Sequence, residues 1–347
     1  MNRLETIKPL DTKAQDECKA RWNAVAMPRC GLGILQQQFV RIAGITGSAD
    51  VSVKRSGVAV MCADNGVTAE RVTQTDSSVT AVVAADINSG KSTANALAFG
   101  MDCTVCAFDM GMNSDVSNVP KYKTACGTQN ITKIAAMSVQ QAEFAIKSGM
   151  DIVKRFADNG CKILVAGEMG IGNTTTASAI SSVLLGRSAE EMTGRGAGLD
   201  SEGLKRKISA VHCAIATNAP DKDNPLELLS KLGGFDIAGM VGLYLGGAVY
   251  RMPIVIDGVV SSVAAAIAVC IKPECRDFML ASHVSAEPSG KALLDFIGAD
   301  APITAGMHLG EGTGGIMLLR MLEGVEDVYT KAHRFVQSGI DPYKELK

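Results

Sequence analysis

The sequence is poor in aromatic residues and has no excess of charge of either sign. Phe, Trp and Tyr make up 4% of the 347 residues, and 34 Lys and Arg stand against 36 Asp and Glu. The formal net charge is therefore −2. Nucleic-acid surfaces usually need a basic excess, and single strands need aromatic stacking platforms. We therefore expect no nucleic-acid partner.

Long hydrophobic runs are also missing. The longest apolar run, 259–271, is too short to cross a membrane, and residues 1–9 lack the apolar core of a signal peptide. We expect a cytoplasmic protein that does not bind a membrane. With 47% hydrophobic and 20% charged residues, the chain has the composition of a globular protein.

The ten cysteines form no metal-ligand pattern. Cys103 and Cys106 lie three apart in a predicted strand, where successive side chains alternate between faces, so the two thiols should point to opposite sides. Cys270 and Cys275 have no Cys or His cluster beside them to complete a zinc site. We expect reduced, mostly buried thiols, with no metal and no cofactor.

Strand-like and helix-like patterns alternate from about residue 56 onward. Strands are predicted at 56–64, 102–110, 162–166, 253–257 and 277–282. Helices are predicted at 77–89, 138–159, 173–185, 204–217, 225–232, 238–250, 261–271 and 290–297, and from 313 towards 321. This alternation favours an α/β fold, a Rossmann-like parallel sheet with helices on both faces. Ser138 and Gln141 form a predicted capping box.

The two ends of the chain have a different pattern. The first fifty residues contain no strand-like run and favour helices with a break at Met27 and Pro28, and the tail after Gly324 is polar and helical. We predict a small helical domain made of residues 1–55 and 325–347. The remaining residues, 56–324, then form the large α/β domain.

The most informative segment is 167–176, which follows the apolar strand 162–166. Its glycines allow close approach of a ligand, and a helix that starts near Asn173 offers free backbone N–H groups to an anion. Glu168 adds a carboxylate at the end of the strand, where open α/β sheets bind their ligands.

This segment matches neither of the general nucleotide motifs. A P-loop needs a lysine that is not there, and Thr175 occupies the third glycine position of a dinucleotide turn. A tight turn without a ligand therefore stays open as an alternative.

A second glycine-rich segment, 308–315, places Glu311 between two glycines. A carboxylate in this setting is open to a ligand, and a closed site can tune its pKa. The alternative is that Glu311 caps the helix that follows, because glutamate is favoured near a helix N-terminus. The local pattern leaves both interpretations open.

Four further segments could contribute to a site. Residues 193–200 are glycine-rich and precede basic residues, which suits a phosphate, although a solvated helix face is the better interpretation for Lys205 and Arg206. In 233–240, Asp236 could cap a helix or hold a ribose hydroxyl.

The other two of these segments are 63–67 and 282–288. An Asn-Gly pair in 63–67 is also an ordinary turn signal. The second segment contains His283, but no nucleophile elbow is present to complete a catalytic triad. His283 and His308 are expected to be turn or core histidines.

Taken in order, these segments resemble the nicotinate-nucleotide:dimethylbenzimidazole phosphoribosyltransferases of cobamide biosynthesis, over roughly residues 56–320. Segments 167–175, 233–240 and 309–314 carry the resemblance. It implies a glycosyltransferase that moves ribose 5-phosphate from nicotinate mononucleotide to an aromatic base such as 5,6-dimethylbenzimidazole. The products would be α-ribazole 5′-phosphate and nicotinate, and the enzyme would be a homodimer.

The resemblance also implies roles for individual residues. Glu311 matches the general base, and Glu168 and Lys207 match pocket residues near the nucleotide. The full set of expected substrate-binding residues is Glu168, Gly170, Gly172, Asn173, Thr174, Gly196, Lys207, Asp236, Ser77, Ser285 and Gly310.

Three departures concern the expected wall of the aromatic-base pocket. Asn65 stands where the family commonly has His, segment 74–80 lacks the usual Tyr-Pro pair, and segment 81–86 lacks the expected Gln and Met. An enzyme that uses phenol or p-cresol as the acceptor, forms an O-glycoside and works as a heterodimer of homologous subunits is therefore an alternative. A hydrolase that uses water and a non-catalytic nucleotide-binding protein are the other rivals.

Overall fold

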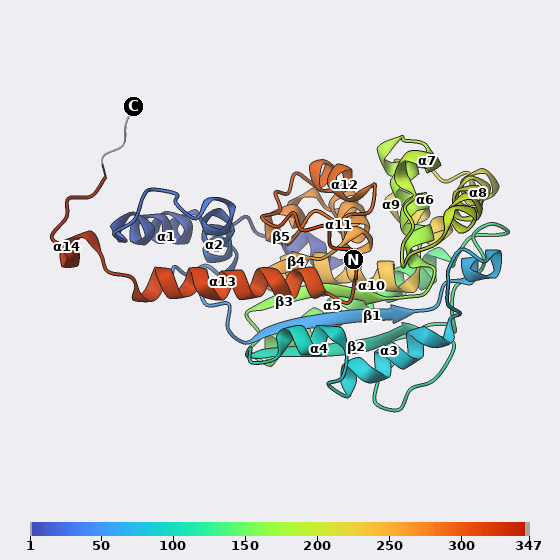
Figure 1. Ribbon diagram of the computed structural model, residues 1–347, viewed down its shortest axis with the longest axis horizontal. Helices are drawn as coiled ribbons and strands as arrows, with labels where there is room; N and C mark the ends of the chain where they lie inside the picture. The colour runs from blue at the N-terminus through green and yellow to red at the C-terminus, as the bar shows by residue number, and fades with distance from the viewer. Residues whose placement is uncertain (1, 344–347) are drawn as a thin grey trace.

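The structure is a computed structural model that describes residues 2–343. Its centre is a five-stranded parallel sheet in the order β2-β1-β3-β4-β5 (Figure 1). The strands are β1 Ser56–Ala63, β2 Cys103–Gly111, β3 Ile163–Met169, β4 Ile254–Ile256 and β5 Met279–Ala281. This is a doubly wound order whose direction reverses between β1 and β3, so the predicted Rossmann-like α/β fold is confirmed.

The strands form a sheet because their side chains serve two hydrophobic cores at once. Along β1, Val58 and Val60 belong to one core, while Ala59 and Met61 belong to the other. Successive side chains of a strand point to opposite faces, so a strand buried on both faces needs apolar residues at every position. All eight residues of β1 are buried.

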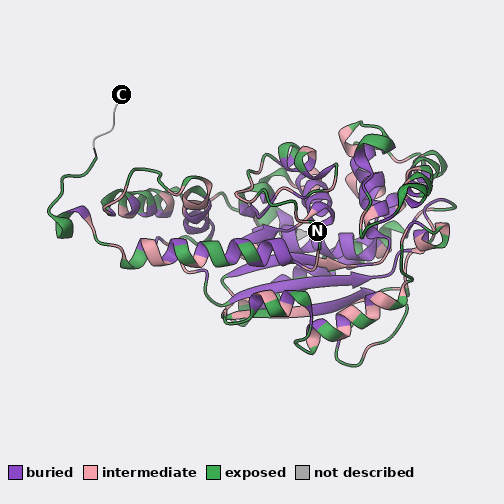
Figure 2. Ribbon diagram, viewed as in Figure 1, coloured by how far each residue is buried: buried purple, intermediate pink, exposed green. Residues whose placement is uncertain are grey.

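Helices cover both faces of the sheet (Figures 1 and 2). One face carries α5 Val139–Asp158, α9 Pro225–Leu232, α10 Phe235–Tyr250, α11 Val259–Ile271 and α12 Gly290–Ile297. The other carries α1 Thr12–Ala24, α2 Gly33–Thr46, α3 Ser78–Asn88, α4 Thr93–Ala98 and α13 Thr313–Lys331. The remaining elements are α6 Asn173–Leu185, α7 Ala189–Met192, α8 Ser201–Asn218, α14 Phe335–Ser338, η1 Asn2–Thr6, η2 Gly66–Glu70 and η3 Pro273–Phe278.

The predicted elements agree with the structure where local signals are strong. The bounds of α6, α9 and α12 are those predicted, and the Ser138–Gln141 capping box starts α5. Two predicted elements end too early. β3 continues to Met169 because it pairs with β1 that far, and α13 continues to Lys331 because its buried face recurs at Leu322, Val325 and Tyr329.

The two ends of the chain are in contact. Trp22 of α1 and Phe39 of α2 pack against Tyr329 of α13, with ring centroids 4.9 and 5.0 Å from that of the tyrosine. The predicted boundary at residue 324 falls inside the continuous helix α13. The division into two domains stays a prediction, which these ring contacts support; Met1 and residues 344–347 lie outside the described residues.

The cysteines behave partly as predicted. Cys106 packs against one core and Cys103 against the other, so their opposite orientation is confirmed. All ten thiols are free, but Cys30, Cys126 and Cys213 are exposed, so the expectation of mostly buried thiols is too strong. Within residues 2–343, no cluster of three or more His, Cys, Asp or Glu could hold a metal ion.

No helix in the described part of the chain combines the length and apolar character needed to cross a lipid bilayer.

Candidate active site

A cavity of about 370 Å³ lies at the carboxyl ends of β3, β4 and β5. This is the edge of the sheet where doubly wound folds bind their ligands. The predicted site residues in its lining are Glu168, Gly170, Gly172, Asn173, Thr174, Gly196, Ser285, Gly310 and Glu311. Segments far apart in the sequence thus meet at one cavity.

Three predicted site residues do not line the cavity. Lys207 and Asp236 lie one contact behind it: Lys207 Nζ donates to Thr174 Oγ1 at 2.8 Å, and Asp236 Oδ2 accepts from Asn173 Nδ2 at 3.0 Å. Ser77 lies farther out, with its hydroxyl 3.4 Å from that of Thr68. The structure therefore brings eleven of the twelve predicted residues to the cavity or directly behind it.

One end of the cavity suits an anion. Helix α6 starts at Asn173 after Gly172, whose φ of 95° is left-handed, and this N-cap glycine supplies no side-chain cap. The first N–H groups of a helix and its dipole favour negative charge there. Lys207 is fully buried beside Thr174, and burial lowers its pKa to about 8, against the opposing effect of Glu287.

Two residues at this end, Glu287 and Arg195, are absent from the predicted set. The backbone N–H of Gly196 donates to Glu287 Oε1 at 3.0 Å, and Arg195 lines the cavity while donating to the carbonyl of Leu199 at 2.7 Å. Glu287 lies in segment 282–288, where the serine and the histidine are the residues that suggest chemistry. Nothing local distinguishes its acid from a surface glutamate, so the sequence pattern misses it.

The middle of the cavity is acidic. The amide nitrogen of Asn173 donates to both Glu168 Oε2 and Asp236 Oδ2. Burial raises the pKa of Glu168 to about 8, opposed by Asn173 and reinforced by the neighbouring carboxylates. Burial likewise raises the pKa of Asp236 to about 6. Both groups therefore hold a proton more tightly than ordinary carboxylates do.

Glu311 lies at the same edge, in a backbone conformation that non-glycine residues rarely adopt. Its φ is 57°, between Gly310 at 93° and Gly312 at 79°. Its Oε2 is buried without a hydrogen-bond partner in the described structure. Burial raises the pKa of Glu311; the N–H of Ala94 opposes this rise and Asp257 adds to it.

Asp257, not Glu311, caps helix α13. The N–H groups of Gly312 and Gly315 donate to Asp257 Oδ2 and Oδ1, at 3.0 and 3.1 Å. Asp257 follows β4 directly and is buried. The capping interpretation of Glu311 is therefore wrong, and the Glu311 side chain is available to the cavity.

The remaining candidate residues differ in their surroundings. Asp236 accepts from the N–H of Ile237 at 2.9 Å within the first turn of α10. Lys205 is exposed and pairs with Glu202, which confirms a solvated face there. His283 is buried beside Ser282, and His308 is exposed, yet both line the cavity.

One wall of the cavity comes from the segment that follows η2. Val72, Thr73, Gln74, Thr75 and Val79 line the cavity. This agrees with the wall expected at 74–80. Asn65 and segment 81–86 are outside the cavity lining: Asn65 is buried next to Gly170, and 81–86 lies within α3. Their part in the wall of the base pocket stays a prediction.

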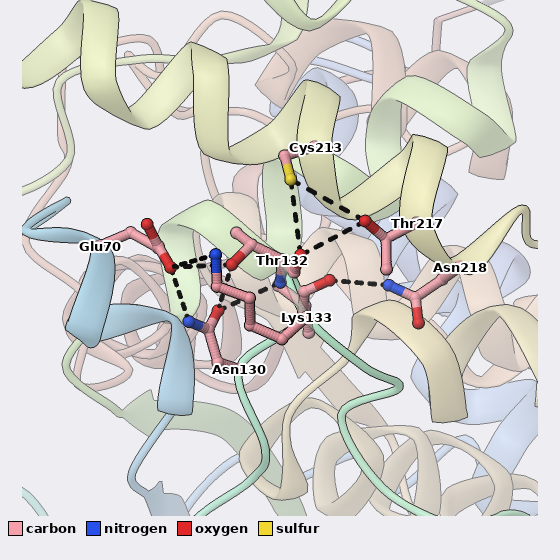
Figure 3. Close-up of polar contacts among 8 residues, drawn as sticks. Glu70, Asn130, Thr132, Lys133, Cys213, Thr217 and Asn218 are labelled. Atoms are coloured by element: carbon pink, nitrogen blue, oxygen red, sulfur yellow. Dashed lines mark hydrogen bonds and ion pairs between the residues drawn. The ribbon is translucent and has the colours of Figure 1, made fainter.

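A network of polar contacts connects η2, which precedes this wall, to loop 128–136 and helix α8 (Figure 3). Glu70, at the end of η2, accepts from Asn130 Nδ2 at 2.7 Å and from Thr132 Oγ1 at 2.8 Å. On the other side, Thr217 of α8 donates to the Thr132 carbonyl at 3.3 Å, and Asn218 donates to the Ile131 carbonyl at 2.7 Å. Loop 128–136 therefore ties η2 to α8, the helix that carries the lysine of the anion end.

Known proteins resemble this chain over almost its whole length. Residues 7–340 match a family model described as "Phosphoribosyltransferase". The nicotinate-nucleotide–dimethylbenzimidazole phosphoribosyltransferase of Clostridium acetobutylicum is 38% identical over 348 residues, covering 100% of this chain and 99% of its own. The protein of the same name from Acetivibrio thermocellus is 39% identical over 343 residues, covering 98% of each chain.

A solved structure shows the same arrangement. The crystal structure of CobT from Thermus thermophilus superposes with a TM-score of 0.89 at 31% sequence identity. The match covers 95% of this chain and all of that one.

Proposed function

The chain belongs to this phosphoribosyltransferase family, and from that premise we propose that its cavity moves ribose 5-phosphate from nicotinate mononucleotide to 5,6-dimethylbenzimidazole or a related base. The products are α-ribazole 5′-phosphate and nicotinate, and the reaction belongs to cobamide biosynthesis. One observation carries the residue assignment: the unpartnered Glu311 carboxylate oxygen shares a cavity with the uncapped start of α6.

In the proposed step, a ring nitrogen of the acceptor attacks C1′ of the nucleotide from the face opposite nicotinate. The bond from C1′ to the nicotinate nitrogen breaks, and its electron pair stays on that nitrogen. Because this nitrogen is cationic in the nucleotide, nicotinate leaves as a neutral ring. The acceptor N–H proton passes to Glu311, whose raised pKa makes it a stronger base than an ordinary glutamate.

The opposite end of the cavity holds the 5′-phosphate. Lys207, Thr174 and the first turn of α6 supply a cation, a hydroxyl and backbone N–H groups. Gly196 lies against this group, since a Cβ there would be 3.2 Å from Lys207 Nζ. Glu168 lies between the two ends, and its raised pKa of about 8 keeps it protonated, so it can donate a hydrogen bond to a ribose hydroxyl.

We further propose a cytoplasmic homodimer. Phe99, which follows α4, and Met317 and Met321 of the adjoining helix α13 are exposed apolar side chains, and Phe99 is 83% exposed. Apolar side chains gathered in this way are typical of surfaces that a partner covers. Sedimentation of the purified chain alone distinguishes a homodimer from a monomer that needs a second subunit.

The assignment of Glu311 is tested by Glu311→Gln. We expect kcat to fall by about 10²–10⁴-fold, the usual contribution of general-base catalysis. Binding of nicotinate mononucleotide, measured by calorimetry, should stay close to wild type because the phosphate end is untouched. Glu323→Gln, farther along α13 and outside the cavity lining, is the matched control. Turnover of Glu311→Gln at the wild-type rate would remove this residue from the base role.

The acceptor is tested by competition. Purified enzyme receives nicotinate mononucleotide with benzimidazoles, adenine and phenols together, and mass spectrometry identifies the nucleotide products. We expect a benzimidazole product to dominate. Ribose 5-phosphate as the main product would indicate a hydrolase, and tight binding without any product would indicate a non-catalytic binding protein.

A further inference from the structure

Asp257 is a buried acid that touches the turn carrying Glu311 but does not line the cavity. Its two carboxylate oxygens accept from Gly312, in that turn, and from Gly315, in the first turn of α13. Its own backbone N–H donates to Ser261 Oγ at 3.1 Å. Ser261 Oγ donates in turn to the carbonyl of Ala166 in β3 at 2.9 Å. Asp257 is therefore fixed to the sheet on one side and to the turn on the other.

The turn needs such support because its backbone is strained. A left-handed φ at a residue with a side chain is unfavourable, and it persists only where the surroundings enforce it. The N–H of Glu311 donates to the carbonyl of Glu168 at 3.2 Å, which holds the turn from its N-terminal side. Asp257 holds it from the C-terminal side, through Gly312.

The start of α13 also lies directly on β3. A Cβ on Gly167 would be 3.0 Å from the backbone nitrogen of Gly312, and a Cβ on Gly315 would collide with the side chain of Val165. The turn therefore has little room to shift along the sheet. The two hydrogen bonds to Asp257 limit the movements that remain.

We propose that Asp257 is a positioning residue for the transfer reaction: it holds the Gly310–Gly312 turn so that the Glu311 carboxylate faces the acceptor. The proposal rests on the proposed role of Glu311 as general base. The competing explanation is that Asp257 only stabilises α13 as a helix cap. A cap would affect folding, whereas a positioning residue acts on kcat through Glu311 alone.

A double-mutant cycle separates these explanations. The variants are Asp257→Asn, Glu311→Gln and the two combined. We expect Asp257→Asn to lower kcat by about 10–100-fold while the KM for nicotinate mononucleotide stays within about threefold. In the Glu311→Gln background the same substitution should cost no further activity, because residues that act through one another are not additive.

A milder pair of variants guards against misfolding. Ser261 lines the cavity, and its hydroxyl contacts the buried Tyr244 hydroxyl at 2.6 Å as well as the backbone of Asp257. For Ser261→Ala we expect a kcat loss of about 3–10-fold, of which the part that acts through Asp257 vanishes in the Glu311→Gln background. Ser262→Ala is the matched control: its hydroxyl donates to the Gly258 carbonyl at 2.9 Å, away from the turn. Its kcat should remain at the wild-type value.

The outcomes are distinct. Wild-type kcat for Asp257→Asn, or the same fold-loss with and without Glu311, would overturn the positioning role. If Asp257→Asn does not fold, Ser261→Ala replaces it in the test. A wild-type kcat for Ser261→Ala, or an equal loss in the wild-type and Glu311→Gln backgrounds, would overturn the positioning role. If Glu311→Gln itself keeps full activity, the proposed base fails, whatever Asp257 does.

Discussion

Two helices begin at the active-site edge with nearly the same local structure. In 170–173 and in 310–313, a Gly-x-Gly turn leads into a helix, and the first helical N–H donates to the carbonyl three residues earlier at 3.0 Å. The last glycine of each turn, Gly172 or Gly312, is left-handed, with φ of 95° and 79°. In neither helix does the N-cap residue supply a side-chain cap.

What lies opposite each turn makes the difference. The first N–H groups of α13 are taken by Asp257, so its positive end holds a protein carboxylate in place. At the start of α6, Glu168 and Asp236 accept from the side chain of Asn173 and no described carboxylate accepts from the first backbone N–H groups, while Lys207 lies beside Thr174. One turn therefore suits binding of a substrate anion, and the other presents a base. Similar local geometry acquires different functions from its tertiary neighbours.

Apart from Glu311→Gln, removing the positive charge beside α6 should have the largest effect on catalysis. Lys207→Met keeps the buried volume but leaves the phosphate without its cation, so we expect kcat/KM for nicotinate mononucleotide to fall by about 10²–10³-fold. Nicotinate riboside, which lacks the phosphate, should be used equally well by variant and wild type. Lys205→Ala, on the exposed face of the same helix, is the control. An equal loss with the riboside would contradict the phosphate role.

Substituting the two glycines should affect different kinetic parameters. Alanine is strained at a left-handed φ, by about 1 kcal/mol. At Gly312 a Cβ would also lie 2.6 Å from Val58 Cγ1, so we expect Gly312→Ala to lower kcat by about tenfold through Glu311. Gly172→Ala should instead raise the KM for the nucleotide. Steady-state kinetics on both variants checks this. If both substitutions changed only kcat, or only KM, the two turns would not differ in function.

Glu168 contacts both helix starts, and its titration should appear in the stability of the fold. Its carbonyl accepts from Glu311 and its side chain from Asn173. Its pKa rises from an ordinary 4.5 to about 8 through burial, so between these values the unfolded chain ionises while the folded chain stays protonated. The free energy of unfolding should therefore fall with rising pH, by at most about 1.4 kcal/mol per pH unit.

Glu168→Gln lacks this titration. Its stability relative to wild type should therefore increase from pH 5 to pH 8 in urea unfolding. The exposed Glu143→Gln is the control. A stability difference that does not change with pH would show that Glu168 ionises normally in the folded protein.

Sequence patterns predict the bounds of single helices and strands better than they predict which elements pack or pair with one another. The bounds of α6 follow from the glycine turn and the threonine-rich start, and those of α9 from Asn224, which caps it. The extent of β3 is missed because it depends on pairing with β1, which no local pattern records. The predicted site residues come from glycine segments and a family resemblance; Ser77 is outside the cavity lining, and its role stays a prediction.

By itself, the sequence determined the alternation of strands and helices, the glycine turns and the presence of acids at strand ends, because these depend on residues a few positions apart. Only the tertiary structure decided which turn meets a lysine and which meets an acid. Asp257 and Gly312 are 55 residues apart, and β4 and the start of α13 bring them within 3.0 Å. The carboxylate that caps α13, and so leaves Glu311 available to the cavity, is therefore a product of the fold.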